Sequence, residues 1–164
     1  MASLQAFLPQ GEGLLPKWLL LLAVVSVFNA AQNYTTLKLT QRVYCGETYY
    51  ASPPASAVDP EGKRPPPPIK LSGVALNPVT PLSARTFGTW TFTSAIVRVY
   101  AAYHINEPAW YQVAFWMLSI TWVHFVAEWK VFGSAAWSRG LASPLIVSTT
   151  SLIWMLAQWG YYVK

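Results

Sequence analysis

Apolar residues dominate four long stretches of the chain. The first, at about residues 17–37, includes twenty consecutive uncharged positions from Trp18 to Leu37. Three more follow at about residues 83–104, 108–130 and 140–162. A helix of about twenty apolar residues crosses the hydrocarbon core of a bilayer, so the pattern predicts four transmembrane helices. The first stretch lacks a small-residue cleavage site followed by a soluble domain, which argues against a signal peptide.

A polar segment at residues 38–82 separates the first two stretches. It is rich in Pro, Ser and charged residues and contains four consecutive prolines at Pro65–Pro68. Proline lacks a backbone donor and has a fixed φ, so we expect a long exposed loop with some polyproline II structure. A docking ligand for a proline-binding domain is the alternative, although proline-rich linkers are commoner. The second and third stretches are joined only by INEP, which predicts a tight antiparallel hairpin.

Composition favours the membrane interpretation. Of 164 residues, 54% are hydrophobic and only 10% are charged, whereas soluble domains carry about 25% charged residues. We therefore predict an all-α membrane protein, a four-transmembrane-helix bundle forming a single membrane domain over residues 1–164. The positive charge is scattered, which does not support nucleic-acid binding. Lys and Arg are more frequent in the first and third loops than at the termini, so these loops are expected to face the cytosol.

Ionisable residues within the predicted membrane helices are the candidate functional residues. In the hairpin, residues equally far from the turn at Asn106 lie at the same depth, which places Arg85 level with Glu128 and predicts an ion pair. His124 precedes Glu128 by one helical turn and shares its face. The resulting polar layer comprises Arg85, His124, Glu128, Asn29 and Gln32. A second polar site is expected about 10 Å from the opposite membrane face, where Arg98 can extend to the surface or meet Gln158.

The residues alone leave several functions open for the polar layer. A carboxylate and an imidazole in a low dielectric can act as an acid/base pair on a lipid-like substrate. The alternatives are ligand binding or transport, and interhelical hydrogen bonding that sets the helix register. A metal site is disfavoured because His124 and Glu128 supply two ligands, whereas catalytic zinc takes three from the protein. With one cysteine and without a glycine-rich phosphate loop, we expect neither a disulfide nor a cofactor.

Several collinear blocks resemble a known family. They are LPKWLL at 15–20, VSVFN at 25–29, LSARTFGTWTF at 82–92, NEP at 106–108, HFVAEW at 124–129 and PLIVSTTSLIWM at 144–155. Together with Gln158, Tyr161 and Tyr162, they resemble the ergosterol biosynthetic protein 28 family in its fungal form. The resemblance extends from Leu15 to Tyr162. The segment near residues 51–76 looks like an insertion relative to the shorter first loop of that family.

The resemblance implies a non-catalytic, multi-pass protein of the endoplasmic reticulum membrane that acts as a scaffold in ergosterol biosynthesis. Its implied partners are the sterol C-4 methyl oxidase, the sterol C-3 dehydrogenase/decarboxylase and the 3-keto sterol reductase. An association with the sterol C-24 methyltransferase is also implied. His124 and Glu128 would then serve as interhelical contacts. A membrane enzyme that modifies sterols with these two residues as acid and base is the alternative.

Overall fold

The computed structural model describes residues 7–46 and 77–163, and every regular element in these ranges is a helix. The long helices are α1 (Leu15–Thr35), α3 (Pro81–Tyr103), α4 (Pro108–Lys130) and α5 (Arg139–Ala157). The short helices are α2 (Lys38–Val43) and α6 (Trp159–Tyr162). The predicted all-α class is confirmed. The core of the predicted proline-rich loop, at residues 47–76, lies outside the described residues.

Proline marks the beginning of three of the long helices. It stands in the first turn of α1, α3 and α4, where a missing N–H costs nothing because the first helical donors lack partners within the helix. At α3, Thr80 and Ser83 also form a reciprocal capping box. The proline in the first turn of α4 explains why this helix begins at residue 108, as the hydrophobic pattern predicts.

Apart from shifts of one or two residues at helix ends, two features differ from the prediction. The segment after α1 is not entirely loop, because residues 38–43 form α2, in which Thr40 is buried. In addition, the fourth long helix ends at Ala157 instead of continuing to residue 162. One of its last carbonyls, that of Met155, accepts a hydrogen bond of 2.6 Å from the Tyr111 hydroxyl. The last carbonyls of a helix have no partner within it, so this bond from α4 stabilises the helix end.

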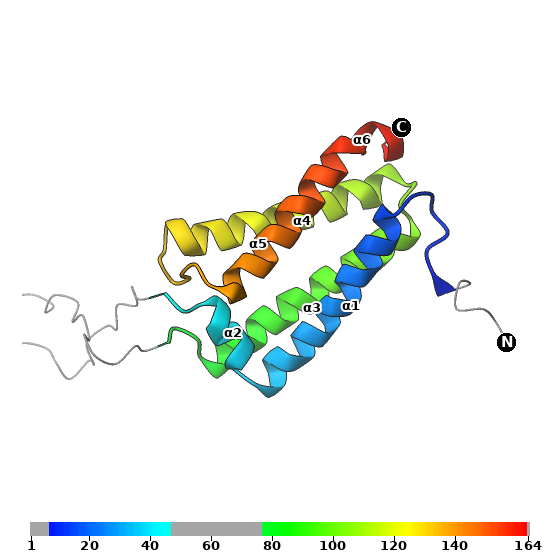
Figure 1. The fold of residues 1–164 in the computed structure, drawn as a ribbon. Helices are drawn as coiled ribbons and strands as arrows, with labels where there is room; N and C mark the ends of the chain where they lie inside the picture. The colour runs from blue at the N-terminus through cyan, green and yellow to red at the C-terminus, as the bar shows by residue number, and fades with distance from the viewer. Residues whose placement is uncertain (1–6, 47–76, 164) are drawn as a thin grey trace, which may run out of the picture.

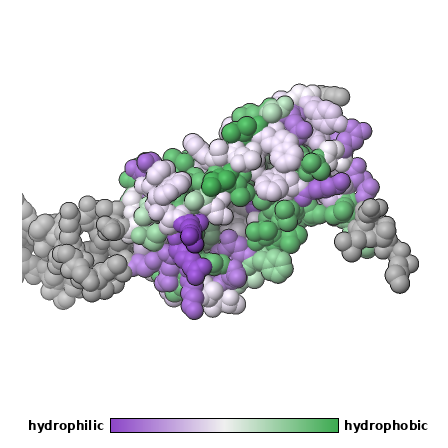
Figure 2. Space-filling view, in the orientation of Figure 1, coloured by the Kyte–Doolittle hydropathy of each residue, from purple (hydrophilic) through white to green (hydrophobic). Residues whose placement is uncertain are grey.

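All four long helices run between the same two ends of the molecule (Figure 1). At one end, Tyr162 and Tyr103 donate hydrogen bonds to the carbonyls of Glu12 and Phe7. At the other end, α2 and the segment after it pack against the α4–α5 connection. Helix α1 packs along α3, and α4 pairs with α5. Hydrophobic residues cover much of the middle of the surface, and strongly hydrophilic ones gather toward the ends (Figure 2).

Small side chains allow α1 and α3 to pack closely. Ala23 and Ala30 of α1 and Ala84, Gly88 and Ala95 of α3 are all buried, as expected where helix backbones approach each other. A larger apolar core surrounds Tyr111 at the end nearer the termini. Among the described helices, α1 and α5 are long and apolar enough to cross a membrane.

Candidate functional site

The His124–Glu128 pair forms the first of two polar clusters in the bundle. The two side chains share one face of α4, with His124 Nδ1 3.9 Å from Glu128 Oε1. On the other edge of the imidazole, Nε2 lies 2.6 Å from the hydroxyl of Tyr44, the residue that follows α2. Burial, and secondarily the charge of Glu128, raises the pKa of Tyr44. The phenol therefore stays protonated and donates to Nε2, leaving the Nδ1 proton to face Glu128.

Glu128 also organises the loop that follows α4. The hydroxyl of Ser134 donates to its carboxylate, and the backbone N–H of Ala135 donates to its carbonyl at 3.1 Å. The N–H of Gly46 in turn donates to the Ser134 carbonyl at 2.9 Å. The pair thus joins α4, its following loop and the segment after α2. A cavity of about 700 Å³ adjoins it, lined in part by Thr80 and Trp90, so the pair also remains accessible to a ligand.

The predicted ion pair between Arg85 and Glu128 is wrong. Arg85 is exposed, and the ion pairs within the described ranges are His124–Glu128 and His104–Glu107. The hairpin does place the two residues on neighbouring helices. Equal depth does not determine the direction in which a side chain leaves its helix, however, and Glu128 faces Ser134 and His124 instead.

The polar residues of α1 form a second, separate cluster. Asn33 is 2% exposed, and its amide donates to Asn29 Oδ1 at 3.1 Å. Its own oxygen accepts a hydrogen bond of 2.8 Å from Thr40 of α2. Gln32, predicted to belong to the polar layer, is exposed. Asn29 therefore joins Asn33 and Thr40 rather than His124 and Glu128, and the single five-residue layer is not formed.

Arg98 also differs from its prediction. It is 7% exposed, and its Nη1 donates a hydrogen bond of 2.7 Å to Ser26 of α1. It does not contact Gln158, whose Oε1 is buried without a hydrogen-bond partner among the described residues. Side chains on a helix lean toward its N-terminus. Arg98 lies near the C-terminal end of α3, so its side chain leans into the bundle and away from the nearer end.

A cavity of about 430 Å³ lies between the two helix pairs. Arg98, Ser26 and Asn29 line it together with Thr40, which also borders the cavity next to His124. Sequence reasoning missed Thr40, Asn33 and Tyr44 as members of these clusters. Asn33 had a usable signal, since it follows Asn29 by one helical turn. Thr40 and Tyr44 had none, because both lie in the segment predicted to be loop.

Comparison with known proteins places this arrangement in a family. The model of the family described as Erg28 like protein matches residues 15–153, a range that includes both clusters. The chain belongs to the Erg28 family. It is 40% identical to the ergosterol biosynthetic protein 28 of Candida albicans over 152 residues, which are 93% of this chain and 90% of that protein. To the Saccharomyces cerevisiae protein of that name it is 39% identical, over 92% and 84% of the two chains.

Mammalian relatives match a smaller part of this Erg28 family member. The human ergosterol biosynthetic protein 28 homolog is 38% identical over 80 residues, which are 49% of this chain and 57% of that protein. No solved structure matches the chain. The family assignment therefore rests on the sequence alone.

Proposed function

We propose that this chain is a multi-pass protein of the endoplasmic reticulum membrane that acts without catalysis as a scaffold in ergosterol biosynthesis. In this role it tethers the sterol C-4 methyl oxidase, the sterol C-3 dehydrogenase/decarboxylase and the 3-keto sterol reductase, and it also associates with the sterol C-24 methyltransferase. Membership of the Erg28 family supports the pathway, since its fungal relatives are named ergosterol biosynthetic proteins. The proposal for tethering rests on the surface of the helices.

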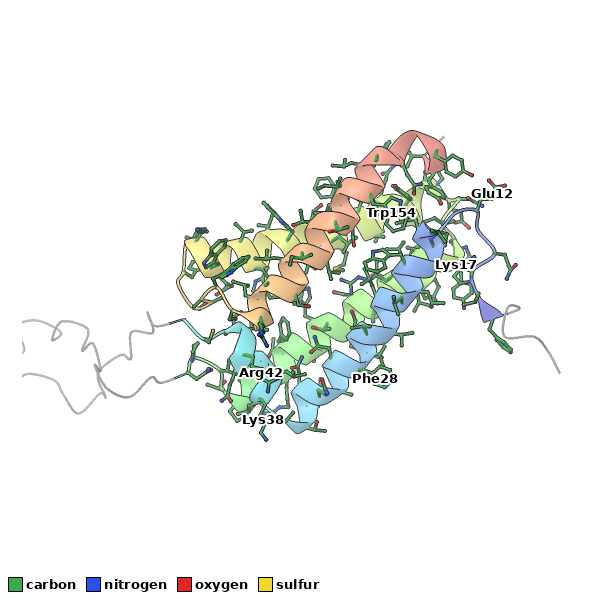
Figure 3. All side chains as sticks on the ribbon, viewed as in Figure 1. Glu12, Lys17, Phe28, Lys38, Arg42 and Trp154 are labelled. Atoms are coloured by element: carbon green, nitrogen blue, oxygen red, sulfur yellow. The ribbon has the colours of Figure 1, made fainter. Side chains whose placement is uncertain are left out.

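The dimensions of the bundle support four membrane crossings. Helices of 21 and 23 residues, such as α1 and α3, are about 31 and 34 Å long at 1.5 Å per residue. This matches a hydrocarbon core of about 30 Å. Charged residues lie at both ends of the bundle, with Lys38 and Arg42 at one end and Glu12 and Lys17 at the other (Figure 3). On this basis α3 and α4 cross the membrane beside α1 and α5.

The tethering proposal rests on one stripe of exposed apolar residues along α4. Val113, Trp116, Ile120 and Val123 recur at helical spacing, and all four are exposed. Trp116 is 63% exposed and lies eight residues into α4, which is about 12 Å along the helix. An indole favours the membrane–water interface over the hydrocarbon interior. Exposed Trp at this depth is better accommodated by a protein partner, and Trp is common at the energetic centres of interfaces.

Tethering is chemically useful for successive reactions on a poorly soluble substrate. Holding two enzymes on one scaffold replaces their encounter in the membrane with a high effective concentration. Each sterol intermediate then meets the next active site before it diffuses away. A scaffold of this kind needs complementary helix surfaces and no reactive group of its own.

The test is an affinity purification of the tagged chain from its native membranes in mild detergent, with mass spectrometry of the proteins that accompany it. We expect the three C-4 demethylation enzymes in comparable amounts. Trp116→Leu should reduce at least one of them about thirtyfold, since central aromatic anchors of interfaces contribute about 2 kcal/mol or more. Phe28→Leu is the matched control, because Phe28 is 67% exposed on α1 and has no polar group that disfavours lipid. Purification of the chain without these enzymes would contradict the proposal.

The alternative function, a sterol-modifying enzyme, is favoured by one observation. His124, Glu128 and the Tyr44 hydroxyl line the same 700 Å³ cavity, which is large enough for a small-molecule site. For an enzyme, Glu128→Gln should abolish conversion of a C-4 methylated sterol by the purified chain and leave the complex intact. For a scaffold, the wild-type chain converts no sterol, and Glu128→Gln alters stability through the loop held by Ser134.

A further inference from the structure

Arg98 is an unusual buried cation because no carboxylate of the described residues accompanies it. The residues that line its cavity in the described part of the chain include no Asp or Glu. Its only hydrogen bond there is the one from Nη1 to Ser26, and its Nε has no hydrogen-bond partner. Buried charges in proteins are normally paired, since leaving one unpaired is costly. The guanidinium is therefore available to an anion that the described residues do not supply.

The position of Arg98 makes solvation by bulk water difficult. Its partner Ser26 lies eleven residues after the start of α1 and nine before its end, which is about 14–17 Å from either end of the helix. The side chain points inward along α3, so it cannot extend to the nearer membrane surface. An intramembrane ionisable residue in such a setting is functional by default.

The cavity suits an amphiphile. Its volume of about 430 Å³ lies within the range of roughly 300–1,000 Å³ typical of small-molecule sites. Along α1 it extends from Leu22 to Asn33, which is about 16 Å. Apolar side chains from three other helices, Phe87, Leu118, Phe125 and Val147, form much of its wall.

Two further arginines line the same cavity. Arg42 of α2 and Arg139 at the start of α5 are both exposed, and Arg42 lies at the end of the bundle opposite the termini (Figure 3). Exposed cations at the entrance of a low-dielectric cavity raise the local concentration of anions. They also remain hydrated, so the buried Arg98 is the residue that gains most from an anionic partner.

We propose that this cavity binds a membrane amphiphile through its anionic group, a carboxylate or a phosphate, which accepts hydrogen bonds from the Arg98 guanidinium. The apolar body of the ligand packs against Leu22, Leu118 and Phe125, and Arg42 and Arg139 favour its entry. Carboxylate and phosphate both match the planar donors of arginine. Two sources meet this description, a carboxylated sterol and an anionic phospholipid. The site does not depend on the tethering role proposed above.

Binding to the full-length chain in phosphatidylcholine nanodiscs tests the proposal, with native mass spectrometry to count bound molecules. Cholesteryl hemisuccinate serves as the sterol carboxylate and phosphatidic acid as the phospholipid probe, with cholesterol and diacylglycerol as their neutral counterparts. We expect at least one anionic probe to bind at least tenfold more tightly than its neutral counterpart. Whichever anionic probe binds more tightly identifies the source. Equal binding of charged and neutral probes would overturn the proposal.

Variants locate the site. Arg98→Gln should weaken binding of the anionic probe at least tenfold, as expected for loss of a charge-assisted pair. Arg85→Gln is the matched control, because it removes the same charge from an exposed position on the same helix and should change binding less than twofold. If Arg98→Gln does not fold, two milder variants replace it in the binding assay. Arg98→Lys keeps the positive charge, and Ser26→Ala keeps the whole guanidinium. Ser26→Ala should retain binding of the anionic probe. If Ser26→Ala loses this binding while Arg98→Lys binds normally, the proposed contact between the anionic group and the Arg98 guanidinium is refuted.

The enzyme-capture experiment separates this site from the tethering role. Arg98→Gln should lose the anionic probe and still recover the sterol enzymes. Trp116→Leu should lose an enzyme and still bind the probe. Unchanged probe binding by Arg98→Gln would overturn the site without affecting the tethering proposal.

Discussion

Replacing Gly140 by Ala should destabilise the bundle, because this glycine allows α5 to begin against the end of α2. A Cβ at position 140 would lie 2.3 Å from the carbonyl oxygen of Arg42 and 2.6 Å from its carbonyl carbon. Both are backbone atoms, so they cannot turn aside as a flexible side chain could. The same Arg42 oxygen accepts a hydrogen bond of 3.1 Å from Ser138. Added volume therefore disturbs both the packing and this bond.

The expected magnitude follows from two opposing effects. Overpacking at a close contact costs about 1–3 kcal/mol. Ala favours helix over Gly by up to about 1 kcal/mol, and less in the first turn, where Gly140 lies. We therefore expect Gly140→Ala to lower the free energy of unfolding by about 1–2 kcal/mol.

Gly160→Ala provides the matched control. Gly160 lies in α6, and a Cβ there would meet nothing within 4 Å. The same substitution should then leave stability unchanged or raise it by about 0.4–1 kcal/mol through the unfolded chain. Thermal unfolding in mild detergent, followed through the fluorescence of the nine tryptophans, measures both variants. If Gly140→Ala were as stable as Gly160→Ala, the close packing of α2 on α5 would be refuted.

Three further substitutions test contacts between helices by the same unfolding measurement. Tyr111→Phe removes the buried donor to the Met155 carbonyl and should cost about 1 kcal/mol; a neutral result would mean that this carbonyl finds water. Trp18→Phe removes the 2.9 Å bond from the indole to Ser151, worth about 0.6 kcal/mol on average in a membrane. It also shortens a ring that packs against the core and Trp154, so the total cost should be about 1–2 kcal/mol; unchanged stability would refute this contact. Gly88→Leu adds carbons where a Cβ would already lie 3.1 Å from α1 side chains, and should cost about 3 kcal/mol; full stability would refute the close α1–α3 contact.

Local sequence signals were sufficient where a helix depends mainly on its own residues. Long apolar stretches predicted the four long helices closely, and α4 at its full length. The fourth helix ends at Ala157, and its last turn is bound by Tyr111 of α4, a residue some forty positions away in the chain. Helix α2 has six residues, too few to be stable in isolation. It forms because Thr40 donates a hydrogen bond to Asn33 and because Gly140, which has no side chain, leaves space for the C-terminal end of α2.

For the polar residues, the sequence was enough to predict which ones lie within the helices. It identified His124 and Glu128 as a pair because their spacing is a property of one helix. The partners of these polar residues depend on the tertiary structure, because the packing of the helices determines which neighbour each side chain faces. Arg85 is thus exposed, although its distance from the hairpin turn predicted a pairing with Glu128. Arg98 leans into a cavity that residues of five helices create together, and no local pattern in the chain encodes such a space.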